Sequence, residues 1–268
     1  MTHFVWVGLF LVVALVRPPG VRASEPDHIT VMTRNLYLGA DVYAAARFLP
    51  DMHAATQFLW EQMRQTSFGA RADAFADEVA RVQPDVIGLQ EAAEWYCRDA
   101  FATNAHTVYD YTDLLIQALK RRGLSYEVAT ATASEPARHL GFSLPTVPFV
   151  TKVTDAQVFP SLYDSDTASC GFAIYDVLLI NSTHADAVYR TGSSDFVYDY
   201  TLIPGFLDMN RGFAWLDMTV GSQTVRVVTT HVEAFLRQFA TVFYSAGTTA
   251  HPRPRHHNKC TDCDGRLQ

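Results

Sequence analysis

The sequence predicts an α+β fold for the main part of the chain. Amphipathic helical patterns dominate its first half, strand patterns joined by a short turn dominate its second half, and no internal repeat is visible. Of the 268 residues, 49% are hydrophobic and 12% aromatic. This composition is typical of a packed core and excludes a disordered or fibrous chain.

The charge balance limits how the protein can bind nucleic acid. The chain has 28 acidic and 21 basic residues, which give a formal net charge of −7. A strongly basic binding surface is therefore excluded. A phosphodiester substrate is not excluded, because a divalent cation held by carboxylates supplies positive charge locally.

The N-terminus has the pattern of a secretory signal peptide. Residues 4–16 form an apolar run that is too short for a comfortable membrane span, and Arg17 with the Pro-Pro-Gly after it ends the run. The small side chain of Ala23 predicts cleavage there, which divides the chain into a signal peptide, residues 1–23, and a mature part, residues 24–268. We expect a secreted or periplasmic protein; an uncleaved membrane anchor is the alternative.

Four cysteines fit an exported protein, because disulfides persist outside the reducing cytoplasm. Cys97 and Cys170 are one candidate pair, and Cys260 and Cys263 are another. Four cysteines allow three connectivities, so the pairing stays open. The Cys260–Cys263 pair follows two histidines at a spacing that also suits zinc, but no second such pair is present and the surroundings are polar.

The first elements place polar residues at strand ends. Residues 28–38 are predicted to form a strand with Asn35 near its far end, and residues 52–82 one or two amphipathic helices. Residues 86–89 form a short apolar run of the buried-strand kind. This run brings Glu91 to the edge of the predicted sheet.

The later elements are mostly strands. A helix is predicted at 111–122 and strands at 125–130, 171–175, 176–180, 211–220 and 224–230, with a hairpin turn at 221–223 between the last two. From residue 239 the chain is polar and without periodicity. We therefore predict a folded domain over residues 24–238 and a disordered tail over 239–268.

Residues 134–168 contain four prolines and little periodicity, which predicts a long surface excursion between strands. Its aromatic residues Phe142, Phe149 and Phe159 suit contact with a lipid or a nucleobase, or equally buried packing.

Three polar stretches carry the candidate chemistry. They are Thr33-Arg34-Asn35, Gln90-Glu91 and the run from Thr229 to Glu233. A metal-dependent phosphoesterase needs a carboxylate for the metal, an amide to orient water or phosphate, and an imidazole to donate to a phosphoryl oxygen. Each residue also has a plain explanation as a solvated strand end, and this is the preferred explanation for Glu233.

These motifs resemble the endonuclease/exonuclease/phosphatase superfamily, which has a DNase I-like fold. The matching patterns are T-x-N at 33–35, P-D-V-x-x-L-Q-E at 84–91 and T-H-x-E at 230–233, and the likeness covers about residues 29 to 235. The resemblance implies a four-layer α/β/β/α sandwich of two mainly antiparallel sheets. It places the active site at one end, where strand ends converge.

The resemblance also implies roles for individual residues. Glu91 would ligate Mg²⁺ or Mn²⁺, Asn35 would support the metal and phosphate site, and His231 would hydrogen-bond the scissile phosphate. Arg211, which precedes a predicted strand, would reach the phosphate. The implied reaction is in-line attack of water on a phosphate ester, which would be a nucleic acid, a phospholipid head group or a small phosphoester. Nothing in the sequence indicates a protein partner.

The sequence departs from the family pattern after Glu233. It contains neither the family's G-D-x-N segment nor its later Asp-His pair. We therefore expect a truncated or frameshifted member, with an incomplete sandwich, the apolar residues 213–216 uncovered and little activity. The alternatives are a secreted binding protein without catalysis on the same fold, and an unrelated α+β binding module.

Overall fold

The structure is a computed structural model of the 268-residue chain. It describes residues 14–15, 28–99, 103–149, 168–196, 200–203 and 207–232. The chain divides into two units, Met1–Ala234 and Phe235–Gln268, and every described residue belongs to the first. The predicted tail, Cys260, Cys263 and Glu233 lie outside the described residues, as does most of the predicted signal peptide.

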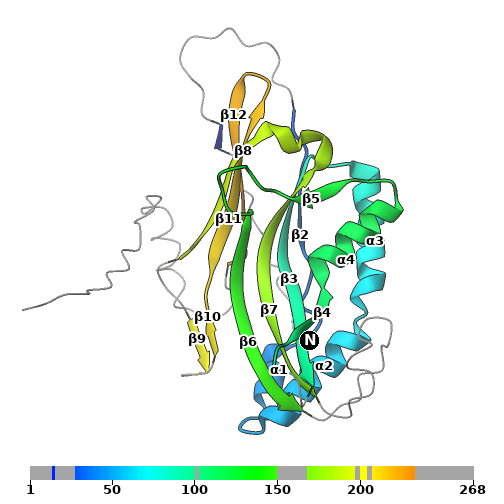
Figure 1. Ribbon diagram of the computed structural model, residues 1–268, viewed down its shortest axis with the longest axis vertical. Coiled ribbons are helices and arrows are strands. Elements are labelled where there is room, and N and C mark those ends of the chain that lie inside the picture. The colour runs from blue at the N-terminus through cyan, green and yellow to red at the C-terminus, as the bar shows by residue number, and fades with distance from the viewer. Residues whose placement is uncertain are drawn as a thin grey trace, which may run out of the picture. The chain divides into compact units, whose positions relative to one another are not determined.

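The main sheet is built on two long antiparallel strands (Figure 1). They are β3 (Val86–Asp99) and β7 (Ala168–Asn181), which pair along their whole length. Four further strands complete this sheet: β2 (Val31–Asn35) lies parallel to β3, β4 (His106–Asp110) lies antiparallel to β3, and β5 (Tyr126–Val128) and β6 (Arg138–Phe149) both pair with β7. The two segments predicted at 171–175 and 176–180 are thus a single strand.

The second sheet has four antiparallel strands in the order β1-β12-β11-β8. They are β1 (Ala14–Leu15), β12 (Gln223–Thr230), β11 (Gly212–Val220) and β8 (Val188–Asp195), and a 3-10 helix, η1 (Ser182–Ala187), leads into β8. The predicted hairpin between β11 and β12 is confirmed. Gly221 begins its turn at a φ of +56°, which glycine adopts without a steric penalty. A separate two-stranded sheet joins β9 (Tyr200–Ile203) and β10 (Leu207–Met209).

The two main sheets pack face to face through aliphatic side chains. The six-stranded sheet contributes Val86, Leu178 and Ile180, and the second sheet contributes Leu216, Val225 and Val227, all buried in one cluster. Figure 1 shows α3 and α4 on the opposite side of the six-stranded sheet from β11 and β12. The predicted α+β class with two mainly antiparallel sheets is therefore confirmed.

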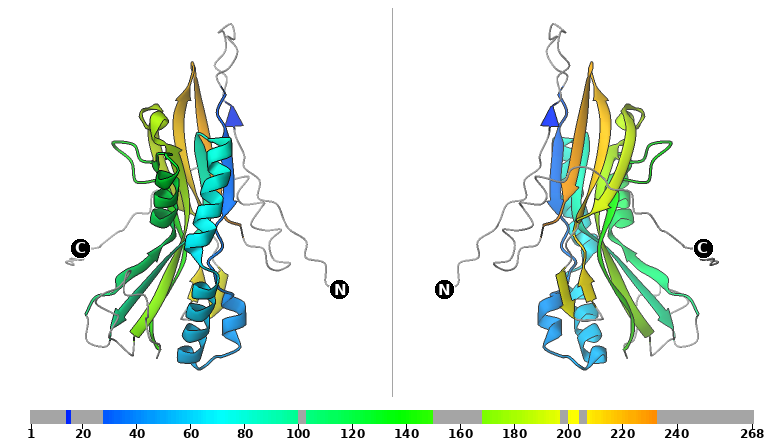
Figure 2. Two further views of the ribbon diagram at one scale, coloured as in Figure 1. Left: turned by 90° about the vertical axis from the view of Figure 1, so that its right-hand side faces the viewer. Right: turned by 90° about the vertical axis from the view of Figure 1, so that its left-hand side faces the viewer.

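The described residues form four α-helices, of which the last three lie where the apolar spacing predicts them, whereas the short first helix was not predicted. They are α1 (Val42–Ala46), α2 (Met52–Gln65), α3 (Phe68–Val82) and α4 (Tyr111–Arg121). In α3 the side chains of Phe68, Ala72, Phe75, Ala76 and Val79 are all buried, as their helical spacing predicts. Figure 2 shows α1 and α2 beside the end of the long strands that lies away from the β11–β12 turn.

The prediction of a surface excursion over 134–168 is wrong for its first part. Residues 138–149 form β6, whose side chains Phe142, Leu144 and Val147 are at most 6% exposed. Prolines are tolerated here because they lie beside irregularities: the pairing of β6 with β7 shifts register between Leu144 and Val147. Phe142 is therefore a core residue, whereas Phe159 and the side chain of Phe149 lie outside the described residues.

Cys97 and Cys170, one of the candidate pairs, form a disulfide between β3 and β7. The two residues are register partners in the sheet, with Cα atoms 4.2 Å apart, and both side chains are fully buried. They lie beside an aromatic cluster in which the rings of Trp95 and Phe172 are 4.8 Å apart. The bridge therefore ties the two central strands together within the core.

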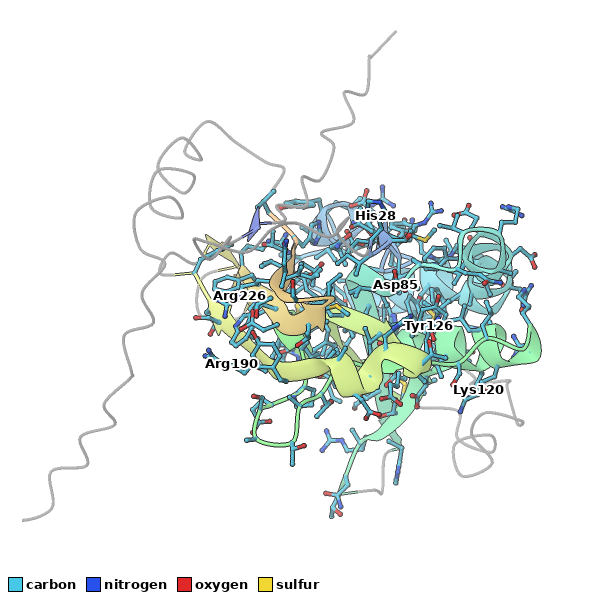
Figure 3. The ribbon with its side chains drawn as sticks, turned by 90° about the horizontal axis from the view of Figure 1, so that it is seen from above. His28, Asp85, Lys120, Tyr126, Arg190 and Arg226 are labelled. Atoms are coloured by element: carbon cyan, nitrogen blue, oxygen red, sulfur yellow. A yellow bond between two sulfur atoms is a disulfide. The ribbon has the colours of Figure 1, made fainter. Side chains whose placement is uncertain are left out.

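The expected exposure of residues 213–216 holds for one face only. Ala214 and Leu216 are fully buried, because they face the other sheet. Trp215 points to the outer face and is partly exposed, and two guanidinium groups lie over its ring: the Cζ atoms of Arg226 and Arg190 are 4.2 and 5.5 Å from its centroid. Figure 3 shows both arginines on the second sheet. Among the described residues, no helix is long and apolar enough to cross a membrane.

Candidate active site

An irregularity in β3 places Glu91. The pairing of β3 with β7 shifts register between Leu89 and Ala92, and Glu91 has a φ of +53°. A bulge of this kind changes the direction of a side chain that regular alternation would send to one face of the sheet. A positive φ is also uncommon for a residue other than glycine, which marks the position as one that its surroundings hold in place.

Both oxygens of the Glu91 carboxylate accept hydrogen bonds. The side-chain amide of Asn35 donates to Oε1 at 2.8 Å, and the backbone N–H of Leu38 donates to Oε2 at 2.8 Å. Asn35 ends β2, where it is the register partner of Gln90. Because β2 and β3 are parallel, their carboxyl-terminal ends meet, and this brings the first two motifs together.

His231 joins this pair from the second sheet. It follows the last residue of β12, and its Nε2 atom lies 3.6 Å from Oε1 of Glu91. About a fifth of each of these two side chains is exposed. The structure thus brings together the three residues that the motifs single out, Asn35, Glu91 and His231, at one partly open place between the sheets.

The buried glutamine of the L-Q-E motif holds the two sheets together at this place. Gln90 is 1% exposed, and its side-chain amide donates to the hydroxyl oxygens of Thr229 at 2.7 Å and Thr33 at 3.2 Å. The sheets approach closely here, since a Cβ atom on Gly88 would be 3.1 Å from the Thr229 hydroxyl oxygen. Gln90 therefore supports the site without facing it.

Asp176 is a site residue that the sequence analysis missed. It lies in β7, is 3% exposed, and its Oδ2 atom accepts a 2.9 Å hydrogen bond from the backbone N–H of His231. Burial raises its pKa to about 7, and the charge of Glu91 adds to this; Arg211 and the His231 N–H act in the opposite direction. The available signal was an aspartate inside an otherwise apolar strand, because a buried acid needs specific partners.

His139 and Arg211 extend the polar cluster from Asp176. His139 of β6 is the register partner of Asp176, is 3% exposed, and has its Nδ1 atom 3.2 Å from Asp195. Burial is the main cause that lowers the pKa of His139, and the positive charge of Arg211 lowers it further. A Cβ atom on Gly212 would lie 2.7 Å from His139 Nδ1, so only glycine fits beside this ring.

Comparisons with known proteins give a likeness in structure but none in sequence. No family model matches the chain, and no curated protein matches it. Among solved structures, it is similar to an endonuclease/exonuclease/phosphatase family protein from Leptotrichia buccalis C-1013-b, with a TM-score of 0.37 and 11% sequence identity. The match covers 77% of this chain and 55% of that protein. Membership of the family therefore stays a prediction that the motifs make.

The donor set at Glu91 fits a magnesium ion. Within the described residues there is no group of three or more histidine, cysteine or acidic side chains placed to hold a metal. Mg²⁺ does not need one, since it commonly uses one or two carboxylates together with waters and substrate phosphates. Each Glu91 oxygen accepts one hydrogen bond and has a second lone pair for a cation.

Replacing Asp176 with asparagine should flatten the pH dependence of stability. The folded chain keeps the proton on Asp176 up to about pH 7, whereas an unfolded chain releases it near pH 4. The contribution of this acid to stability is therefore lost as the pH rises through that interval. Between pH 5 and pH 8, we expect the wild type to lose about 3 kcal/mol more unfolding free energy than Asp176→Asn.

Urea unfolding of both proteins at the two pH values measures this difference. Asparagine keeps an oxygen that can accept from the His231 N–H, so that hydrogen bond is not the variable. Parallel pH profiles for the two proteins would show that Asp176 does not bind the extra proton.

Proposed function

We propose that this protein is a Mg²⁺-dependent phosphoesterase that catalyses in-line attack of water on a phosphate ester. The observation that carries the proposal is the placement of Glu91. Its carboxylate is held by the Asn35 side chain and the Leu38 N–H, each at 2.8 Å, and the imidazole of His231 lies 3.6 Å away. A fixed carboxylate beside an imidazole suits a metal-assisted reaction at phosphorus.

In this proposal Glu91 holds Mg²⁺ or Mn²⁺. Such an ion, when bound, would supply positive charge to offset that of the phosphate and would make water a better nucleophile. The amide nitrogen of Asn35 donates to Glu91, and its oxygen accepts a 2.7 Å hydrogen bond from the N–H of Tyr37. Asn35 therefore supports the metal site mainly by fixing the carboxylate. A carboxylate that is already fixed does not have to reorient when substrate binds.

His231 and Arg211 would act on the phosphate itself. His231 would donate from its imidazole to a phosphoryl oxygen, and the hydrogen bond from its backbone N–H to Asp176 fixes its position. The positive charge of Arg211 lies close enough to Asp176 and His139 to lower the pKa of both. This charge would also attract the phosphate.

We extend the proposal to an extracytoplasmic location. The disulfide between Cys97 and Cys170 joins central strands of the fold. Structural disulfides of this kind form and persist in oxidising compartments. The apolar run of the first residues, with small residues at the predicted cleavage position, supports the same location.

Metal-dependent turnover tests the proposal. The purified full chain should release 4-nitrophenol from bis(4-nitrophenyl) phosphate with Mg²⁺ or Mn²⁺ and should stop when EDTA removes the ion. 4-Nitrophenyl phosphate, tested in parallel, distinguishes diester from monoester specificity. Rates that do not exceed a protein-free blank would contradict the enzymatic proposal. Retained binding of phosphate esters without turnover would favour a non-catalytic binding protein on the same fold.

A further inference from the structure

Tyr37 is an exposed aromatic residue that lies between two buried leucines. It lies between β2 and α1, where its side chain is 45% exposed, whereas Leu36 and Leu38 on either side are 5% and 3% exposed. The exposed ring leaves apolar surface in water, so folding gains no hydrophobic stabilisation from that surface. A ligand that covers the ring would gain this stabilisation on binding.

The backbone at Tyr37 is held in an unfavourable conformation. Its φ is +58°, a region that few residues other than glycine adopt, and bulky residues least of all. Three contacts maintain it: the Tyr37 N–H donates to Asn35 at 2.7 Å, the Leu36 N–H donates to the Gln90 carbonyl at 2.7 Å, and Arg71 donates to the Tyr37 carbonyl at 3.2 Å. Strain that the surroundings hold in place is common at ligand-binding positions.

The same contacts tie the ring to the candidate active site. Asn35, which accepts from the Tyr37 N–H, donates its amide to Glu91. Leu38, the next residue in the chain, donates its N–H to the other oxygen of Glu91. Two hydrogen-bonded paths thus fix the Tyr37 backbone relative to the carboxylate of the proposed metal site.

The surroundings of the ring favour a neutral, planar group over a cation. The guanidinium carbon of Arg71 lies 5.6 Å from the centroid of the Tyr37 ring. A ligand cation would have to share the ring with this positive charge, whereas a nucleobase stacks on a ring that a cation already contacts. The nearby carboxylate of Asp41 is engaged as the cap of α1, accepting from the Ala44 N–H at 2.9 Å.

We propose that Tyr37 stacks on a base attached to the phosphate that Glu91 and His231 bind, which makes the substrate a nucleotide or nucleic-acid phosphoester. This inference rests on the proposed function, because it uses the same phosphate site. The ring would supply recognition of the group beside the phosphate. Stacking of this kind tolerates different bases, since every base has a planar face.

Equilibrium binding tests the proposal without requiring turnover. Calorimetric titration of the full chain in Mg²⁺ would compare thymidine 5′-phosphate with deoxyribose 5-phosphate, which lacks only the base, and with phosphocholine. We expect the base to improve wild-type affinity by about 5- to 100-fold. Tyr37→Asn should remove that preference and leave the affinity for deoxyribose 5-phosphate unchanged, whereas Tyr37→Phe, which keeps the ring, should retain it.

Two controls separate the possible causes. Asparagine tolerates a positive φ, so Tyr37→Asn should unfold at or above the wild-type temperature, and a loss of affinity cannot then be attributed to misfolding. Glu91→Gln should weaken both phosphate probes equally, because it acts at the phosphate and not at the base.

Each outcome has a distinct meaning. A base preference that depends on Tyr37, in a protein without Mg²⁺-dependent turnover, would support this inference and overturn the proposed reaction. Equal affinity of the wild type for the two sugar phosphates, or no binding of either, would overturn the role of Tyr37. A preference for phosphocholine that Tyr37→Asn removes would also overturn it, since the ring would then bind a cation.

Discussion

Glu91→Gln is expected to lower Mg²⁺-dependent phosphoesterase turnover by about 10²- to 10³-fold, which corresponds to several kcal/mol of transition-state stabilisation. Glutamine has the same size but no charge. It would also present an amide NH₂ group to one of the two donors, the Asn35 amide and the Leu38 N–H, that now hold the carboxylate. The measurement is the initial rate of nitrophenyl ester hydrolysis over a series of Mg²⁺ concentrations.

Glu94→Gln is the matched control for this substitution. Glu94 lies on the same strand, β3, and is also a partly buried carboxylate, but its partners are the hydroxyls of Thr107 at 2.6 Å and Tyr175 at 3.3 Å and the guanidinium of Arg138 at 3.9 Å. We expect its rate to stay within about threefold of the wild type, because exposed and half-buried polar pairs have small energetic effects. Equal losses in the two variants would show that Glu91 acts through the fold and not at the metal.

Removing the disulfide should produce the largest loss of stability. The double variant Cys97→Ala/Cys170→Ala opens a bridge between residues 73 positions apart, and loop-closure entropy predicts a loss of about 4 kcal/mol. For a chain of this size the melting temperature should fall by about 10 °C. Thermal unfolding followed by circular dichroism measures the change.

The variant Cys260→Ser/Cys263→Ser serves as the control, because it also removes two cysteines but not the bridge between β3 and β7. We expect its melting temperature to equal that of the wild type. A reducing agent that reaches the bridge should lower the wild-type melting temperature toward that of Cys97→Ala/Cys170→Ala. If that variant melted at the wild-type temperature, the bridge would contribute nothing to stability.

Elements with a strong local pattern could be predicted from the sequence. The buried face of α3, from Phe68 to Val79, follows from helical spacing, and the β11–β12 hairpin follows from two strand patterns separated by a glycine turn. Both elements are determined by residues close together in the chain. Their local structure therefore depends little on contacts with the rest of the fold.

The sequence analysis misjudged two elements because their structure depends on the strands with which they pair. Residues 138–149 contain prolines that indicate a loop, yet they form β6, because a register shift against β7 accommodates Pro145. Strand β3 extends well past the apolar run 86–89, since the bulge at Glu91 breaks the alternation but not the pairing with β7.

The residues of the candidate site also form two groups, one predicted from the sequence and one brought together only by the fold. The polar strand-end motifs, with the family resemblance that they carry, singled out Asn35, Glu91 and His231, and the structure brings all three together. The sequence did not single out Asp176 or His139, which are neighbours only because β6 and β7 pair in this register. Tyr37 was also missed, because its exposure follows from a backbone conformation that three separate contacts impose.

The sequence by itself determined the α+β class, the main helices, the last hairpin and the residues at the three motif positions, because period and turn chemistry are local properties. Only the tertiary structure decided which contacts the site residues make and which of their pKa values are shifted. The Glu91 carboxylate is fixed by donors more than 50 positions away, and the pKa of Asp176 reaches about 7 only where both sheets exclude water. Burial and long-range hydrogen bonds depend on which strands meet, and that information is spread over the whole fold.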